Sequence, residues 1–103
     1  MFIAMNRFQV TKGREQDFEK VWQSRDSRLN EMLGFQEFRL LRGPEHEDHT
    51  LYSSFTVWSS KDNFEAWTKS EQFREAHKNA GQNDNLYLGH PNFEGFEPVE
   101  GIS

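Results

Sequence analysis

The organisation of the chain is clearest in residues 56–78, which read TVWSSKDNFEAWTKSEQFREAHK. The β-branched and aromatic residues that end at Trp58 are typical of a strand. The serine pair at 59–60 then offers N-cap oxygens for a short helix, which carries Phe64 and Trp67 on one face because they are three residues apart. The stretch therefore predicts a strand followed at once by a helix with an aromatic inner face.

A second short helix is expected directly after the first. Ser70 can cap it, and Phe73, Ala76, His77 and Ala80 follow with the i, i+3, i+4, i+7 spacing of a buried stripe. A histidine is therefore predicted to face inward, next to the helix that carries the inward-facing tryptophan.

Composition limits the class of protein. The 103 residues fit a single domain, 1–103, and ten Phe with three Trp indicate a small, aromatic core that a partner subunit or a ligand could complete. The net charge of −5, with basic residues dispersed among acids, disfavours nucleic acid and anionic membranes as partners. The absence of cysteine excludes thiolate chemistry and, with no apolar stretch as long as a membrane span, favours a cytoplasmic location.

Residues 2–10 alternate as a strand in which both faces are covered. The even-numbered residues form one apolar face, which the amide of Asn6 interrupts. A buried amide without a partner costs about 1–3 kcal/mol. Asn6 is therefore expected to bond to neighbouring backbone, the interpretation that we favour from sequence, or to a ligand in the core. The opposite face carries Ile3 and Met5.

A long helix is predicted from about Arg14 to about Met32, after a turn at residues 11–13, and Gly34 is well placed to end it. Arg25 lies on the same side as the apolar stripe of this helix. It either extends to the edge of the core, which we favour, or pairs with an anionic group of a ligand. The stripe consists of Phe18, Val21, Trp22, Leu29 and Leu33.

Two more strands are expected at residues 35–42 and 50–58, joined by a polar turn at 43–49. The two histidines and three acids of this turn suggest a metal site, but a solvated hairpin tip explains them as well and is favoured. Residues 79–92 are predicted to form a long loop, and 92–99 a last strand.

The order β-α-β-β-α-β predicts an α+β, ferredoxin-like fold with an antiparallel sheet and helices on one face. The sheet face that carries Ile3 and Met5 then has nothing in the chain to cover it. This predicts a homodimer that forms sheet face to sheet face, as a dimeric α/β barrel.

The same fold would bring Asn6, Trp67 and His77 to one pocket between the sheet and the helices. The chain shows no carboxylate pair, Ser-His-Asp order, P-loop or dinucleotide fingerprint to accompany them. A lone histidine on an apolar helix face is more often a core residue than a ligand. An aromatic pocket with one imidazole is nevertheless what an axially ligated haem requires.

The chain resembles the bacterial haem-degrading monooxygenases, the non-globular haem oxygenases of the antibiotic-biosynthesis-monooxygenase superfamily. The resemblance covers the first strand, the third strand and the second helical region, and Gly34-Phe35 also fits the pattern. It is carried by Asn6-Arg7-Phe8 with Thr11-Lys12-Gly13, and by Thr56-Val57-Trp58 followed by Phe64, Trp67, Lys69-Ser70, Phe73 and Ala76-His77-Lys78.

This resemblance implies a role for each residue of the pocket. His77 would be the axial ligand of the haem iron, and Asn6 would donate a hydrogen bond on the opposite side, toward bound dioxygen. Trp67 would press on the porphyrin and help to ruffle it, and Phe64 and Phe73 would complete the haem-binding wall. The implied reaction opens the haem ring with O2 and electrons from an external donor, and releases iron and a bilin-type product.

Two points depart from the family's pattern. The loop at residues 81–91 matches no motif of the family; its Tyr87 and His90 are candidates to contact haem. The acidic net charge does not attract the haem propionates, so these would point to solvent, with Arg25 as a candidate partner.

Three alternatives stay open from sequence. The first is a cofactor-independent monooxygenase that acts on a small quinol or aromatic substrate in the same pocket. The second is a haem carrier or sensor without turnover, and the third is a dimeric structural barrel in which His77 is a core residue. Sequence also leaves open whether the product is biliverdin with carbon monoxide or an oxidised bilin with a formyl-derived fragment.

Overall fold

Four strands and three α-helices alternate along the described part of the chain in the order β-α-β-β-α-α-β. The computed structural model describes residues 1–25, 28–77 and 86–102, without the side chains of residues 76 and 77. The strands are β1 (Phe2–Thr11), β2 (Phe35–Glu45), β3 (His49–Trp58) and β4 (Asn92–Phe96). The helices are α1 (Glu15–Ser24), α2 (Lys61–Thr68) and α3 (Glu71–His77), with a 3-10 turn η1 (Leu29–Glu31) after α1.

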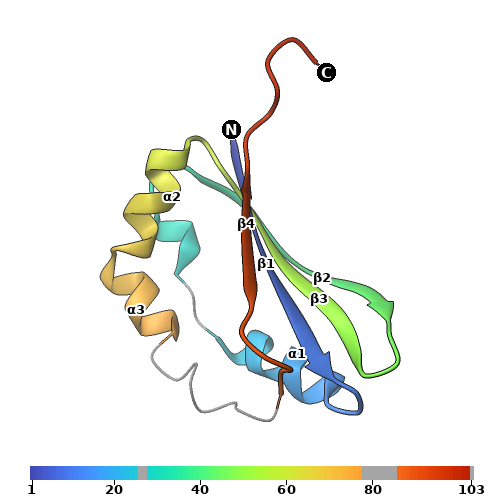
Figure 1. Ribbon diagram of the computed structural model, residues 1–103. Coiled ribbons are helices and arrows are strands. Elements are labelled where there is room, and N and C mark those ends of the chain that lie inside the picture. Colours follow the sequence, from blue (N-terminus) through green and yellow to red (C-terminus); the bar gives the residue numbers. More distant parts are fainter. Residues whose placement is uncertain (26–27, 78–85, 103) are drawn as a thin grey trace.

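The strands pair antiparallel in the order β2-β3-β1-β4. The helices lie on one face of this sheet, with α1 near one end and α2 and α3 along one side (Figure 1). The predicted ferredoxin-like α+β fold is therefore confirmed. Among the described residues, no helix has the length and apolar character needed to cross a membrane.

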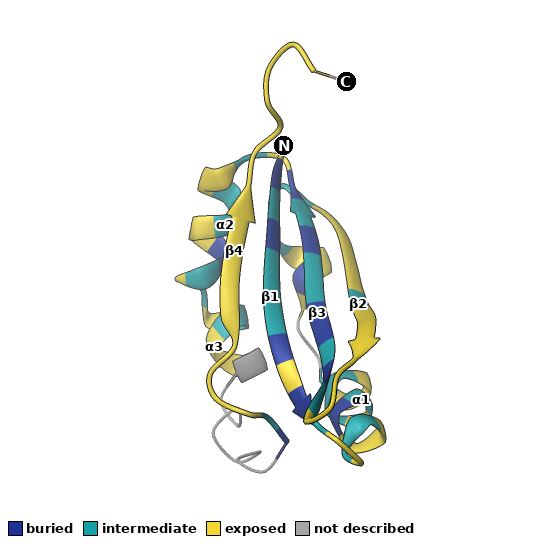
Figure 2. Cartoon of the chain, turned by 45° about the vertical axis from the view of Figure 1, so that its right-hand side comes forward, coloured by how far each residue is buried: buried dark blue, intermediate teal, exposed yellow. Residues whose placement is uncertain are grey.

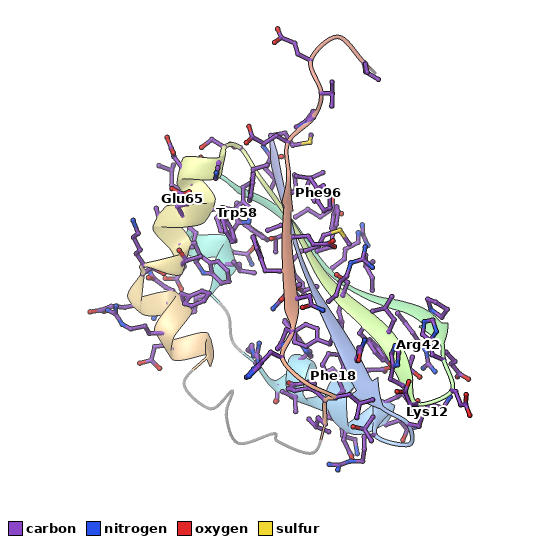
Figure 3. All side chains as sticks on the ribbon, viewed as in Figure 1. Lys12, Phe18, Arg42, Trp58, Glu65 and Phe96 are labelled. Carbon is purple, nitrogen blue, oxygen red and sulfur yellow. The ribbon has the colours of Figure 1, made fainter. Side chains whose placement is uncertain are left out.

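Burial separates the central strands from the edges of the sheet. β1 and β3 contain the buried strand residues, whereas β2 is mostly exposed and β4 is exposed along its whole length (Figure 2). The helix-facing residues of β1 belong to two core clusters. One packs beneath α2, where Trp58 lies between that helix and the sheet (Figure 3), and consists of Phe2, Ala4, Leu29, Trp58 and Trp67. The other packs beneath α1 and consists of Phe8, Val10, Phe18 and Tyr52.

These two clusters meet at one position of β1. Ala4 belongs to the first cluster and Phe8 to the second, and Asn6 lies between them on the same face of the strand. The amide that interrupts the apolar face therefore marks the gap between the two cores.

The predicted helix at residues 14–32 is wrong in its second half. α1 ends at Ser24, whose Oγ bonds back to the Val21 carbonyl at 3.0 Å, and Arg25 already has an extended backbone. The sequence after Val21 is rich in residues that bond to their own backbone and so compete with a helix. The predicted stripe is only partly retained, because Leu29 is buried in η1 whereas Leu33 is 83% exposed.

The polar turn predicted at 43–49 is shorter than expected. β2 continues to Glu45 and β3 begins at His49, with a register shift between Arg42 and Glu45. Pro44 lacks a backbone donor, and an irregularity on an edge strand is where a sheet tolerates it. His46 and His49 stack at the hairpin with ring centroids 4.5 Å apart, but the described residues contain no group of three potential metal ligands.

The last strand is also shorter than the predicted 92–99. β4 ends at Phe96, before Pro98, and residues 97–102 extend away from the sheet (Figure 1). Gly95 is needed in this strand, since a Cβ there would lie 2.6 Å from the Phe2 ring. The predicted loop at 79–92 lies partly outside the described residues.

Gly34 is expected to be the most sensitive glycine of the fold. It has φ +84°, and a Cβ would lie 2.3 Å from the Asn63 side chain, which itself accepts a hydrogen bond from the N-cap residue Ser60. Gly34→Ala should therefore lower the free energy of unfolding by more than about 1 kcal/mol, measured by urea denaturation. Gly13→Ala has a similar φ of +90° but no atom within 4 Å of the added Cβ, so it measures the backbone part alone. Equal losses in the two variants would contradict the role of Asn63.

Candidate functional site

A cavity of about 450 Å³ lies between the sheet and the helices, at the gap between the two core clusters. Its size falls in the range of pockets that hold small organic molecules, and its walls are mainly aromatic and aliphatic with a few polar groups. All four strands, α1, α2, α3 and η1 contribute to it. The lining residues are Ala4, Met5, Asn6, Trp22, Arg25, Leu29, Phe38, Ser54, Thr56, Phe64, Trp67, Thr68, Phe73 and Phe93.

Asn6 presents the polar group at the centre of the sheet wall. The register of the strands places it opposite Ser54 on β3 and opposite Phe93 on β4. Within the described residues its side-chain amide makes no hydrogen bond, although the sequence alone favoured a bond to neighbouring backbone. A half-buried amide that faces a cavity without a partner is available to a ligand.

The aromatic residues predicted from the helical stretch form the opposite wall. Phe64 and Trp67 come from α2, and Phe73 comes from α3, where it packs edge-on to Trp67 at 4.7 Å. Both caps that set this arrangement are as predicted, since the Ser60 hydroxyl accepts from the Asn63 N–H and the Ser70 hydroxyl accepts from the Phe73 N–H.

Trp67 is nearly buried between this wall and the core. Its ring packs on Trp58 at 5.6 Å and also lines the cavity. The indole is therefore held by the core on one side and can press on a ligand on the other.

His77 is the last residue of α3, but its side chain lies outside the described residues. The structure thus brings Asn6, Phe64, Trp67 and Phe73 to one cavity, and the backbone of the helix that carries His77 begins at that cavity. The inward orientation of the His77 imidazole stays a prediction.

Arg25 lines the end of the cavity next to α1. Its guanidinium lies 4.4 Å above the centre of the Trp22 ring, and burial lowers its pKa from the ordinary value. Within the described part of the chain it forms no ion pair, whereas Arg7, Arg14 and Arg28 do. The predicted proximity of Trp22 and Arg25 is correct, and the guanidinium is a partly desolvated cation at the wall of the cavity.

Several lining residues were not identified from sequence as part of a site. Phe38, Ser54, Thr56 and Phe93 lie on three strands that face the cavity. Ser54 and Thr56 are the cross-strand partners of Asn6 and Ala4, so they could have been found once the pairing register was known. No local pattern marks them.

The loop candidates for ligand contact are not at the cavity. Tyr87 bridges to Val10 and packs on Phe8 at 5.5 Å, in the core beneath α1, and His90 is exposed. Neither lines the cavity in this conformation, so their contact with a ligand stays a prediction.

The fold and the cavity together define an α+β, ferredoxin-like protein with an aromatic ligand pocket between its sheet and its helices. The chain belongs to the antibiotic biosynthesis monooxygenase family, whose sequence model matches residues 1–79. The matched region contains the first three strands and all the helices, so it includes the Asn6, Trp67 and His77 positions.

Two relatives are haem oxygenases by name. The chain is 32% identical over 80 residues to a heme oxygenase (staphylobilin-producing) of Staphylococcus haemolyticus, which covers 77% of this chain and 75% of the relative. It is 35% identical over 77 residues to heme oxygenase (staphylobilin-producing) 1 of Staphylococcus aureus, which covers 75% of this chain and 71% of the relative.

Solved structures show the same fold. The heme-degrader MhuD of Mycobacterium tuberculosis, with two hemes bound in its active site, has a TM-score of 0.71 at 25% identity, and the match covers 100% of both chains. A MhuD variant with two manganese protoporphyrin IX molecules bound per active site has a TM-score of 0.74 at 26% identity, over 100% of this chain and 99% of that chain. SnoaB, a cofactor-independent oxygenase from Streptomyces nogalater, has a TM-score of 0.69 at 22% identity over 98% and 95% of the chains, and shows the fold alone.

Proposed function

We propose that this protein is a haem-degrading monooxygenase that binds haem, its substrate, in the cavity between the sheet and the helices. The observation that carries the proposal is the Asn6 amide, which faces an aromatic cavity without a partner among the described residues. Support also comes from the 32–35% identity to named haem oxygenases and from the likeness to porphyrin-bound MhuD.

The residues of the cavity fit such a substrate. A porphyrin needs flat, apolar walls, and Phe64, Trp67 and Phe73 offer aromatic surfaces on the helix side. Polar groups of a cavity are costly unless a ligand or water satisfies them, and the Asn6 amide is such a group.

Each residue then has a defined part. His77 would bind the iron through its imidazole, which fixes the depth of the substrate in the cavity. Asn6, on the sheet wall opposite α3, would orient the reacting oxygen by donating from its side-chain nitrogen. Trp67 is held by Trp58 and would press on the porphyrin plane, and Phe64 and Phe73 would exclude water.

Arg25 would bind a propionate of the substrate. A guanidinium that has no carboxylate partner among the described residues, and that is partly desolvated at the cavity wall, gains most from an anionic ligand. The sequence favoured a simple extension to the core edge, and the position of the guanidinium at the cavity wall supports the anionic-ligand alternative.

The iron-porphyrin supplies the redox chemistry and is itself the molecule that is cleaved. The reaction would consume O2 and electrons from an external donor, and release iron and a bilin-type product. The cavity walls would exclude bulk water. Asn6 would direct ring opening to the carbon that lies beside it. A cytoplasmic location stays a prediction.

We also propose that two chains associate through the sheet face opposite the helices. The described residues leave this face uncovered, and its apolar residues follow from the strand register: Ile3, Met5 (which also borders the cavity), Leu41, Phe55, Val57 and Phe96. An apolar face of this kind is typical of a self-association surface.

Phe55→Glu should convert a dimer into a monomer, because it places a carboxylate at the centre of the apolar face. The monomer tolerates this change, since Arg39 is the cross-strand neighbour of Phe55. Analytical ultracentrifugation at micromolar concentration gives the mass. Gln16→Glu adds the same charge on exposed α1 and should leave the dimer intact. A monomeric wild-type chain, or a dimeric Phe55→Glu variant, would contradict the proposal.

Binding is tested by hemin titration with visible spectroscopy. A saturable Soret band at one haem per chain supports the site, and saturation at two per chain would indicate a cavity filled by a stacked pair. The absence of a band would redirect the search to quinol substrates, with His77 as a core residue.

A further inference from the structure

Trp22 carries a buried hydrogen-bond donor that has no partner in the described part of the fold. Its indole Nε1 has no acceptor among the described residues, although the ring lines the cavity. Trp58 shows how the same fold satisfies a buried indole, because its Nε1 donates to the Thr56 hydroxyl at 3.0 Å. An unsatisfied buried donor is uncommon and costs stability, so Trp22 requires an explanation that packing alone does not give.

The ring of Trp22 is held on several sides. It stacks on Phe38 with centroids 5.8 Å apart and an interplanar angle of 23°, and it packs edge-on to Phe8 at 5.8 Å. Phe18 lies at 6.2 Å, and the Arg25 guanidinium covers the ring at 4.4 Å. The direction of the Nε1–H bond is therefore fixed by packing, as a positioning group requires.

Trp22 and Arg25 also share one end of the cavity. Arg25 is a cation without an ion-pair partner in the described part of the chain, and Trp22 is a donor without an acceptor. One carboxylate could satisfy both, because it has two oxygens that accept from different donors. A neutral ligand edge would leave the guanidinium unpaired.

We propose that Trp22 is a positioning residue whose Nε1–H donates to a carboxylate of the substrate that Arg25 binds. The inference rests on the proposed haem site and extends it to a second donor on α1. Nε1 is buried in this conformation, so the proposal requires a local rearrangement on binding, in which the Arg25 guanidinium over the ring shifts toward the anion and the carboxylate gains access to Nε1.

Two donors at one end restrict how a planar substrate can turn within its plane. The carboxylate edge is held at α1, and the opposite edge then lies toward the interior of the cavity. Which bridging carbon of the macrocycle faces Asn6 therefore depends on Trp22. Loss of the donor should broaden the set of bilin regioisomers without requiring a loss of binding.

The indole proton itself gives the direct test. Uniformly ¹⁵N-labelled protein is saturated with zinc protoporphyrin IX, which is diamagnetic, and in parallel with its dimethyl ester, which lacks the carboxylates. The Trp22 indole peak is assigned as the one missing from Trp22→Phe. Comparison of the two complexes cancels the ring current of the porphyrin.

We expect the Trp22 indole proton to lie downfield in the free-acid complex relative to the ester complex, while the Trp58 indole, already bonded to Thr56, stays at one position. Identical Trp22 positions in two saturated complexes would overturn the inference and leave the haem site standing. Failure of both porphyrins to bind would overturn the proposed function, and this inference with it.

Affinity gives a second, independent readout. Wild-type protein should bind the free acid more tightly than the ester, and Trp22→Phe should reduce that preference about three- to tenfold. A purely structural role predicts that Trp22→Phe weakens both porphyrins equally, with the preference unchanged. That outcome would also overturn the inference.

Discussion

His77→Ala is expected to remove the axial ligand and to lower haem affinity at least tenfold, equivalent to about 1.4 kcal/mol. An imidazole bond to iron is the strongest single contact that this chain can offer the substrate, since it has no cysteine. Hemin titration should show a shifted, weakened Soret band, and the apoprotein should keep its fold by circular dichroism.

His90→Ala is the matched control for this result, because His90 is exposed and does not line the cavity. Its titration should match wild type. Added imidazole should restore the wild-type spectrum to the His77→Ala complex by filling the vacated position. An unchanged Soret band and an unchanged affinity in His77→Ala would contradict the assignment of His77 as the axial ligand. His77 would then be interpreted as a core residue.

Asn6→Ala is expected to separate binding from degradation. The amide faces the cavity without a partner among the described residues, so its removal leaves no new unsatisfied group in the fold. Haem affinity should stay within about threefold of wild type, while degradation slows about 10²–10³-fold, the usual loss when one positioned donor is removed from a reacting group. The rate is followed as decay of the Soret band.

Ser54→Ala provides the control on the same wall. Ser54 is the cross-strand partner of Asn6 and also lines the cavity, so the variant removes a polar group of similar depth but no amide. Its rate should remain near wild type. Equal turnover in Asn6→Ala and wild type would remove Asn6 from the reaction, and an equal loss in both variants would point to general polarity of the wall.

The parts of the site that sequence could predict depend on local patterns. The alternation around Asn6 in β1 and the caps at Ser60 and Ser70 each follow from neighbours within a few residues. The same spacing rules put Phe64 and Trp67 on one helix face, and both line the cavity. Local rules thus identified Asn6, Phe64, Trp67 and Phe73, all of which line the cavity.

Other parts depend on contacts that no local pattern encodes. Phe38 and Phe93 reach the cavity from edge strands, and their places follow only from the sheet order β2-β3-β1-β4. The early end of α1 at Ser24 also matters, because it leaves Arg25 on an extended backbone, at the cavity wall rather than along a helix. The apolar stripe resumes at Leu29, seven residues after Trp22, so the helical periodicity alone predicted an unbroken helix.

The most direct test of the account is turnover of bound haem by the wild-type protein. The haem complex is given ascorbate in air with catalase present, so that free peroxide cannot cause the reaction. The account predicts that the Soret band decays, that a bilin-type absorbance replaces it, and that iron becomes available to a chelator. A haem band that persists under these conditions would contradict the monooxygenase assignment and indicate a haem carrier or sensor.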